Sequence, residues 1–129
     1  MISFLAAAIS AIIVSVHDGD TITVRIGAVT EIVRLLDIDA PELPPRAHCP
    51  SEAAGALAAR DALRRLAPPG LAVTLQQTGR LRDRYGRLLA LVILSDGRGA
   101  GNALMQAGLA RAWTGKRHGW CPDLASPKP

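Results

Sequence analysis

The chain has 129 residues, a length that suits one domain with a modest hydrophobic core and leaves little room for a second. Lysine and arginine number 15 against 11 acidic residues, which gives a formal charge of +4 at pH 7. This mild basic excess favours a polyanion such as nucleic acid as a partner. The apolar run Ile2–Val16 is too short for a transmembrane helix, which needs about 20 apolar residues, so we expect no stable membrane span.

The first half of the chain alternates apolar and polar residues with the two-residue period of β-strands. This alternation covers residues 11–16, 22–26 and 30–38, which are separated by the turn residues HDGD and GA. We therefore expect three consecutive antiparallel strands. Residues 1–10 are an apolar extension that could be a short helix, a continuation of the first strand or the remnant of an export signal.

A loop with four prolines, over residues 40–50, separates these strands from a predicted helix. Ser51 is a suitable N-cap for this helix, which should end near Leu66 before the residues PPG. Its apolar face is predicted from the helical spacing of Ala54, Ala58, Ala62 and Leu66, with Leu57 beside them.

The second half adds two strands and a short helix. Residues 71–78 and 88–94 have the pattern of a fourth and a fifth strand, and a helix from Asn102 to about Gln106 should close at Gly108. Three strands, a helix, two strands and a helix is the order of a five-stranded Greek-key barrel of the OB type, an α+β fold that is mainly β. A flat two-layer α+β sheet fits the same order.

The two cysteines, Cys49 and Cys121, lie far apart in the sequence, and each has a histidine nearby, His48 and His118. A disulfide, a zinc site and two free thiols are the alternatives. Adjacent histidine and cysteine side chains rarely point at one metal ion, which favours the disulfide. A disulfide would indicate an oxidising compartment, so export to the periplasm or the exterior is slightly favoured over a cytoplasmic location.

Three polar clusters interrupt the apolar scaffold: HDGDT at 17–21, RLLDIDAPE at 34–42 and DRYGR at 83–87. Each alone could be an ordinary turn. Together their residue types are complementary, because Asp20 and Asp39 offer the hard oxygen ligands that calcium or magnesium needs, and Glu42 follows closely. Arg34 and Arg87 add guanidinium groups whose geometry suits a phosphodiester. A cation, a base and two guanidiniums around one phosphate would form a phosphoryl-transfer site.

The ordered set DGDT, RLLDIDAPE, DRYGR and GNALMQAGLA resembles the staphylococcal nuclease (thermonuclease) family over roughly Ile12–Trp113. The resemblance implies an OB barrel with packed helices, in a single domain over 1–129 with its core at about 11–113. It also implies a calcium-dependent nuclease, acting as a monomer on DNA or RNA with little sequence specificity. Water would attack the phosphodiester in line and leave 3'-phosphate ends. The family's long third helix is missing, and residues 114–129 are expected to be an irregular tail.

The resemblance further implies roles for individual residues. The calcium ligands would be Asp20, Asp39 and the backbone carbonyl of Ala40. Glu42 would be the general base, and Arg34 and Arg87 would hold the phosphate and stabilise the transition state. The remaining matches are Arg84 and Tyr85, which would contact a terminal phosphate and the nucleotide, and Asp18 and Thr21, which would support the ligands.

Two details of RLLDIDAPE stay open. Asp37 could tune metal affinity or simply face solvent. Arg34 and Asp39 are five residues apart and would lie on opposite faces of a flat strand, so a bend before Pro41 is required. The alternative to an enzyme is a non-catalytic OB-fold module that binds nucleic acid or protein. The presence of all five residues at the predicted centre favours catalysis, and a structural protein built around Ile2–Val16 is a third, weaker interpretation.

Overall fold

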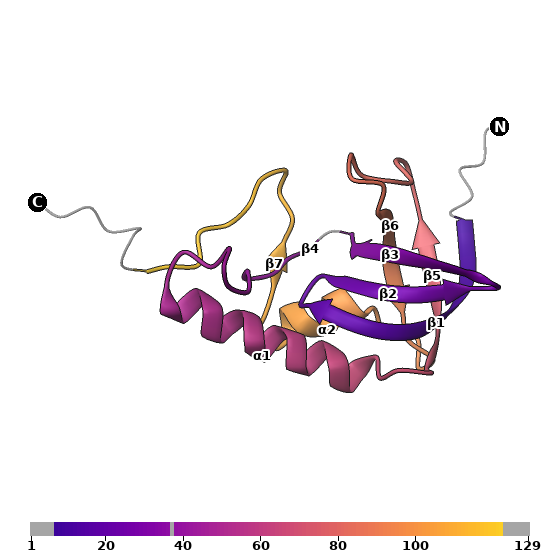
Figure 1. The fold of residues 1–129 in the computed structure, drawn as a ribbon, viewed down its shortest axis with the longest axis horizontal. Helices are drawn as coiled ribbons and strands as arrows, with labels where there is room; N and C mark the ends of the chain where they lie inside the picture. Colours follow the sequence, from indigo (N-terminus) through magenta and orange to yellow (C-terminus); the bar gives the residue numbers. More distant parts are fainter. Residues whose placement is uncertain (1–6, 37, 123–129) are drawn as a thin grey trace, which may run out of the picture.

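The computed structural model describes residues 7–36 and 38–122. The barrel strands are β1 Ala7–Asp18, β2 Thr21–Ile26, β3 Val29–Leu35, β5 Ala72–Gln77 and β6 Leu88–Ile93. The other elements are α1 Pro50–Leu66, α2 Ala100–Gln106, β4 Ile38–Asp39 and β7 Arg111–Ala112. The five strands close in the order β1-β2-β3-β6-β5, with α1 and α2 outside the barrel (Figure 1). The predicted OB-type barrel of class α+β is therefore confirmed.

Strand β1 is long enough to pair with two neighbours. Its residues from Ala7 to Ile12 pair with β5, and those from Ile12 to Asp18 pair with β2, with irregular register near Ser15 and after Val16. The barrel closes where β3 runs parallel to β6. Residues 7–10 of the apolar extension are thus strand, and its first six residues lie outside the described part of the chain.

Alternating side chains of the strands fill the interior of the barrel. The largest of them are fully buried, and they include Ile13, Ile22, Leu35, Leu75 and Val92. Each such side chain contributes about 1.5–3 kcal/mol by leaving water. The two-residue period seen in the sequence is the pattern of this core. None of the helices in the described residues is both long and apolar enough to cross a membrane.

Helix α1 differs from its prediction at both its start and its buried face. Its N-cap is Cys49, not Ser51, and Pro50 stands at the first helical position, where its fixed φ suits the helix. The sulfur of Cys49 accepts a hydrogen bond from the backbone N–H of Glu52 at 3.4 Å. The predicted apolar face is wrong at Ala54, Leu57 and Ala58, which are exposed, whereas Ala62 is buried as predicted and Leu66 is half-buried.

The buried face of α1 consists of small residues together with Leu63. These buried residues are Ala56, Ala59, Ala62 and Leu63. A Cβ placed on Gly19 would lie 2.8 Å from the Cβ atoms of both Ala40 and Ala59, so the helix packs tightly on the turn after β1. The close contact between Gly19 and Ala59, and not helical spacing alone, determines which face of α1 is buried. Helix α2 begins at Ala100, two residues before the predicted Asn102, and ends at Gln106 as expected.

The bend predicted between Arg34 and Asp39 is present. Strand β3 ends at Leu35, and β4 begins at Ile38 in a separate two-stranded sheet with β7. Asp37, whose role the sequence left open, lies outside the described residues.

The chain after β7 has no regular secondary structure from Trp113 to Pro122, so the described part of the tail is irregular as expected. Cys121 forms a disulfide with Cys49, and the two Cα atoms are 6.1 Å apart. This bond joins the tail to the first residues of α1. In Figure 1 the tail and the loop before α1 lie together at the end of the helix that projects beyond the barrel.

Candidate functional site

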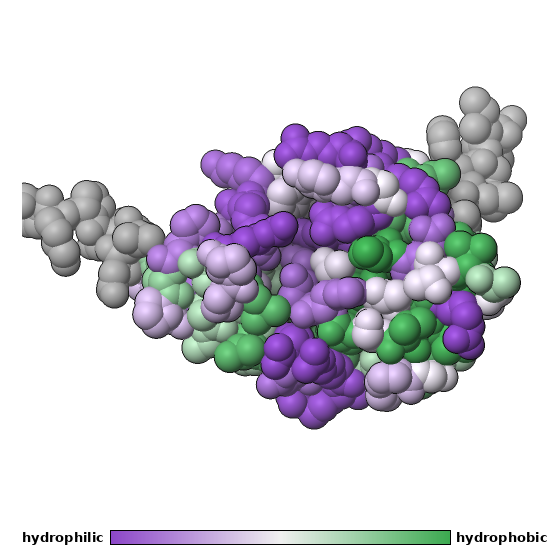
Figure 2. Space-filling model, in the orientation of Figure 1, coloured by the Kyte–Doolittle hydropathy of each residue, from purple (hydrophilic) through white to green (hydrophobic). Residues whose placement is uncertain are grey.

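A groove with a volume of about 1220 Å³ lies between the barrel, the loop after β4 and the tail. Hydrophilic side chains surround a hollow on the face shown in Figure 2. Six arginines and only two carboxylates, those of Glu42 and Asp83, line the groove. The arginines are Arg34, Arg46, Arg80, Arg84, Arg87 and Arg117. This excess of positive charge in a concave surface attracts and concentrates anions.

The turn between β5 and β6 forms the barrel side of the groove, and Asp83 organises it. One oxygen of Asp83 accepts hydrogen bonds from the backbone N–H groups of Tyr85 (2.9 Å) and Arg87 (3.0 Å). The other oxygen accepts from Nε of Arg87 at 2.7 Å. Burial opposes ionisation of Asp83, but the bonds from Arg87 and Tyr85 outweigh it and hold its pKa below the ordinary value. An ionised Asp83 therefore fixes the guanidinium of Arg87.

The aromatic ring of Tyr85 lies beside these arginines. The guanidinium carbon of Arg84 is 4.9 Å from the ring centre, and that of Arg87 is 5.7 Å away. Tyr85 is 69% exposed and lines the groove, so much of the side chain stays open to solvent. The predicted substrate contacts Arg84 and Tyr85 thus lie side by side on one wall of the groove.

Arg34, from the end of β3, is fixed by the bend that follows it. Its Nη1 donates to the carbonyl oxygens of Leu35 (2.6 Å) and Ile38 (3.0 Å). Its Nη2 lies 3.4 Å from Oδ2 of Asp20. The guanidinium also lies 5.9 Å from the ring centre of Trp113 in the tail. Arg34 therefore joins the groove to the buried carboxylates behind it.

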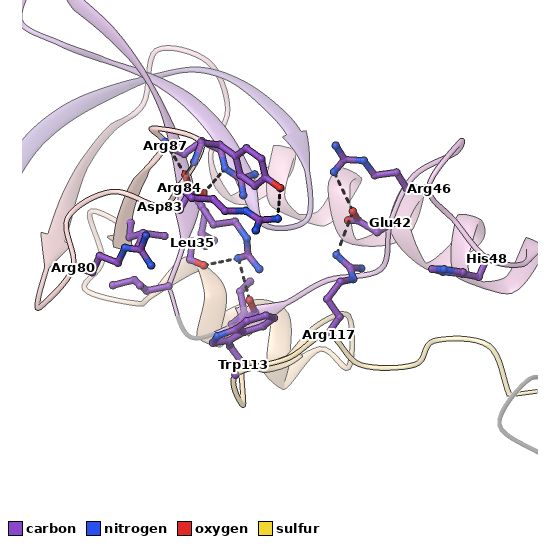
Figure 3. A pocket seen from close by; sticks show the side chains of 16 residues that line it. Leu35, Glu42, Arg46, His48, Arg80, Asp83, Arg84, Arg87, Trp113 and Arg117 are labelled. Carbon is purple, nitrogen blue, oxygen red and sulfur yellow. Dashed lines mark hydrogen bonds and ion pairs between the residues drawn. The ribbon is translucent and has the colours of Figure 1, made fainter.

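Glu42 lies on the opposite wall from Arg84 and Arg87 (Figure 3). Its Oε1 is 3.4 Å from Nη1 of Arg46 and 3.3 Å from Nη1 of Arg117. Two guanidiniums thus meet one carboxylate oxygen at the rim of the groove. Both arginines place positive charge next to this carboxylate.

The three predicted metal ligands are buried beneath the groove. Asp20 and Asp39 are 4% and 0% exposed, and the backbone N–H of Ala40 donates to Oδ2 of Asp20 at 3.2 Å. Thr21 donates its hydroxyl to the other oxygen of Asp20 at 3.1 Å. Oδ2 of Asp39 accepts from the backbone N–H of His118 at 2.9 Å. Its Oδ1 is buried and lacks a hydrogen-bond partner among the described residues.

Asp18 shows how crowded the negative charge is at this place. Burial, followed by the neighbouring charge of Asp20 and a smaller effect of Glu42, raises the pKa of Asp18 to about 7. Like charges that raise a carboxyl pKa would be relieved by a cation. Asp18 and Thr21 are both hydrogen-bonded to Asp20, the residue that the sequence predicts as a metal ligand.

The oxygen donors of the predicted metal site suit a hard cation, although they are few. Within the described residues, no group of three or more His, Cys, Asp or Glu side chains is arranged to hold a metal ion. Two carboxylates and a backbone carbonyl, all oxygen donors, are what Asp20, Asp39 and Ala40 can offer. The buried oxygen of Asp39 that lacks a partner among the described residues and the raised pKa of Asp18 both suit a cation at this place.

The structure also brings in residues that the sequence reasoning missed. The role of Asp83 could be inferred locally, since Asp83 opens a turn four residues before Arg87. Glu52 accepts a hydrogen bond from the backbone N–H of Glu42, and the sequence marks it only as an acidic residue in the first turn of a helix. The rest, Arg46, Trp113 and Arg117, reach the groove through the loop and the tail, whose positions depend on long-range contacts.

The fold and the site together define a small OB-type barrel protein with an arginine-lined groove beside buried carboxylates. Residues 32–122 match a family model described as Staphylococcal nuclease homologue, and the chain belongs to the staphylococcal nuclease family. This family is typically one of nuclease hydrolases and generally uses Ca²⁺. Asp18, Asp20 and Thr21 precede the matched range. No curated protein matches the chain.

Proposed function

We propose that the protein is a calcium-dependent nuclease that hydrolyses phosphodiesters of DNA or RNA with little sequence specificity. The observation that carries the proposal is the meeting of Glu42, Arg34 and Arg87 in one groove above the buried pair Asp20 and Asp39. These groups supply a base, two fixed positive charges and oxygen ligands around a space large enough for a phosphate.

The arginines stabilise the charge that develops on phosphorus. A five-coordinate phosphorus carries more negative charge than the ground state, so guanidiniums held in advance favour the transition state selectively. Arg34 is held by two carbonyl oxygens, and Arg87 is held by Asp83. Losing one such group costs about 2.7–4 kcal/mol of transition-state stabilisation.

Glu42 takes the proton of the attacking water. As the oxygen of water bonds to phosphorus, its proton passes to Glu42. The bond from phosphorus to the 5'-oxygen breaks, and the leaving oxygen takes a proton from the solvent of the groove. The products are a 3'-phosphate end and a 5'-hydroxyl end. Arg46 and Arg117 lie beside the carboxylate that takes this proton.

Asp20, Asp39 and the carbonyl of Ala40 would hold the calcium ion. When bound, the ion supplies positive charge next to the phosphate and polarises the phosphoryl oxygen. Arg34 contacts Asp20, so it lies beside one of the residues that would hold the ion.

Low sequence specificity follows from the kinds of group in the groove. Arginines contact phosphates, which are the same at every nucleotide, and the exposed ring of Tyr85 offers a stacking face to any base. No base-reading role is needed to explain the groove.

The test is digestion of plasmid DNA and of RNA with calcium, with EDTA, and with the variant Glu42→Gln. Asp61→Asn is the matched control, because Asp61 is an exposed carboxylate of α1 that does not line the groove. We expect cutting with calcium, none with EDTA, and a loss of a hundredfold or more in Glu42→Gln alone. Equal cutting with EDTA, or an unchanged Glu42→Gln, would refute the mechanism. Binding without cutting would favour the non-catalytic module.

We also propose that the protein acts as a monomer in an oxidising compartment, periplasmic or extracellular. The disulfide between Cys49 and Cys121 supports this location. Alkylation of free thiols in intact cells before lysis tests it, since a protein from a reducing compartment would be labelled at both cysteines. Light scattering of the eluted protein tests the monomer, and a mass near 13.6 kDa is expected.

A further inference from the structure

The tail segment 113–121, called the arm below, is fixed to the site at several points near its end. His118 donates its backbone N–H to Asp39 at 2.9 Å. Arg111 donates from Nη1 to the carbonyl of Gly119 at 2.9 Å, and Cys121 is bonded to Cys49. The arm has no regular secondary structure of its own, so its position depends on these contacts.

Arg117 is the residue that the arm delivers to the groove. It stands immediately before His118, and its Nη1 lies 3.3 Å from Oε1 of Glu42. The side chain of Arg117 is 45% exposed and lines the groove, so a ligand in the groove can reach it. It faces Arg84 and Arg87 across the groove, where Figure 3 shows it beside Glu42.

The pairing with Glu42 cannot be the whole role of Arg117. The same oxygen is already paired with Arg46, and a partly exposed ion pair of this kind contributes little to stability, about 0–1 kcal/mol. A phosphate entering the groove offers a guanidinium two strong acceptors. Arg117 can therefore exchange Glu42 for a phosphate, which leaves Oε1 of Glu42 paired with Arg46 alone.

We propose that Arg117 is a substrate-binding residue that grips a phosphate of the nucleic acid, and that the Cys49–Cys121 disulfide positions it by holding the arm. The inference rests on the proposed function for the nature of its ligand. It adds a second wall to the binding groove, opposite Arg84 and Arg87, made by the tail instead of by a helix.

The first test is binding of a fluorescein-labelled single-stranded oligonucleotide, measured by anisotropy in EDTA so that no cutting is needed. Arg117→Ala should weaken binding about tenfold, since it removes a charged hydrogen bond. The slope of log Kd against log salt should fall by about 0.7, as one phosphate contact is lost from a single strand. Arg65→Ala removes an exposed arginine of α1 outside the groove and should change neither value. Equal effects of the two substitutions would overturn the proposal.

This readout separates the two proposals. If the wild type does not cut nucleic acid but Arg117→Ala weakens binding, the nuclease proposal is refuted and the role of Arg117 stands. If the wild type cuts nucleic acid but Arg117→Ala binds as tightly as the wild type, the nuclease proposal stands and the role of Arg117 is refuted.

The second test asks whether the disulfide acts through Arg117. Oxidised and reduced forms of the wild type and of Arg117→Ala make a double-mutant cycle. Reduction should weaken binding about tenfold in the wild type and hardly at all in Arg117→Ala. An equal loss in both proteins would show that the disulfide does not act through Arg117. Circular dichroism verifies that the reduced forms are folded.

If reduction unfolds the protein, a variant with an insertion in the arm is used in place of the reduced form. Two glycines placed between Arg117 and His118 leave the disulfide and the contact with Asp39 intact but slacken the arm. Binding reduced to the level of Arg117→Ala supports the positioning role, and wild-type binding overturns it.

Discussion

The carboxylate of Glu52 in α1 accepts a hydrogen bond from the backbone N–H of Glu42 at 3.0 Å. Its second oxygen accepts from the backbone N–H of His48 at 2.8 Å and lies 3.2 Å from Nδ1 of the same residue. Glu52 is 2% exposed. One buried carboxylate therefore holds both ends of the proline-rich loop that carries the proposed base.

Glu52→Gln should lower kcat about tenfold without abolishing binding. The amide keeps the shape of the side chain but loses the charge, and hydrogen bonds to charged groups contribute about 1.5–3 kcal/mol. Steady-state kinetics on a short oligonucleotide measure the effect, with Asp61→Asn as the control. A wild-type kcat in Glu52→Gln would show that the loop holds Glu42 without this carboxylate.

Glu52 also predicts a pH dependence of stability. Burial opposes its ionisation, but hydrogen bonds from His48 and Glu42 outweigh burial and keep the pKa of Glu52 below its usual range. A depressed folded-state pKa stabilises the protein above the ordinary carboxyl pKa, and this stability is lost as the pH falls through the folded value. Urea unfolding between pH 6 and pH 3 should show a smaller loss of stability in Glu52→Gln than in the wild type.

Asp83→Asn should raise KM and lower kcat, with a loss of about tenfold in kcat/KM, because Arg87 holds the phosphate and stabilises the transition state. The amide cannot accept the bonds from Nε and two backbone N–H groups equally well, so Arg87 loosens. Asp96→Asn is a close control. Asp96 holds Arg98 in a similar turn, through the backbone N–H at 3.0 Å and Nε at 2.8 Å, and neither residue lines the groove. Equal effects of the two substitutions on KM would contradict a role for Asp83 at the site.

Gly19→Ala should destabilise the protein by about 1–3 kcal/mol and reduce activity. Its Cβ would lie 2.8 Å from the Cβ atoms of Ala40 and Ala59, so the turn that carries Asp18 and Asp20 would move away from α1. Gly99→Ala is the control, since its Cβ would come no closer than 3.8 Å to Asn102. Equal free energies of unfolding for both variants would show that the close packing at Gly19 is not limiting.

Much of the fold could be predicted from local patterns, because the barrel strands alternate with period two and the core follows that period. The pairing of β4 with β7 could not, since each has two residues and no period to detect. The buried face of α1 was also missed. Spacing alone favoured Ala54 and Ala58, whereas tight contact with Gly19 selects Ala59.

The candidate site divides in the same way. Arg34, Glu42 and Arg87 belong to short motifs, and the structure brings all three to one groove. Arg46 and Arg117 stand in no motif. Arg46 reaches Glu42 from four residues further along the same loop, whereas Arg117 reaches it because the disulfide joins the tail to the start of α1. A contact that depends on two segments 72 residues apart leaves no local signal.

Asp18 predicts that the calcium-free protein becomes less stable as the pH rises from about 4 to 7. Burial and the charge of Asp20 raise its folded-state pKa to about 7 from an ordinary value of 3.8, so the folded protein retains a proton that the unfolded chain releases. The slope of unfolding free energy is at most about −1.4 kcal/mol per pH unit for one proton. Asp18→Asn should remove this contribution in EDTA, and an unchanged slope would contradict it.

Calcium should raise the thermal unfolding midpoint, and Asp39→Asn should remove the shift. A ligand that binds only the folded state stabilises it by about 2.7 kcal/mol at a hundred times its Kd, which amounts to several degrees for a domain of this size. Oδ1 of Asp39 is buried without a hydrogen-bond partner among the described residues, so a cation would satisfy an atom that is otherwise costly to bury. Differential scanning fluorimetry in calcium and in EDTA measures the shift, with Asp61→Asn as the control. The same shift in Asp39→Asn and in the wild type would place the ion elsewhere, because a carboxamide lacks the charge that holds calcium.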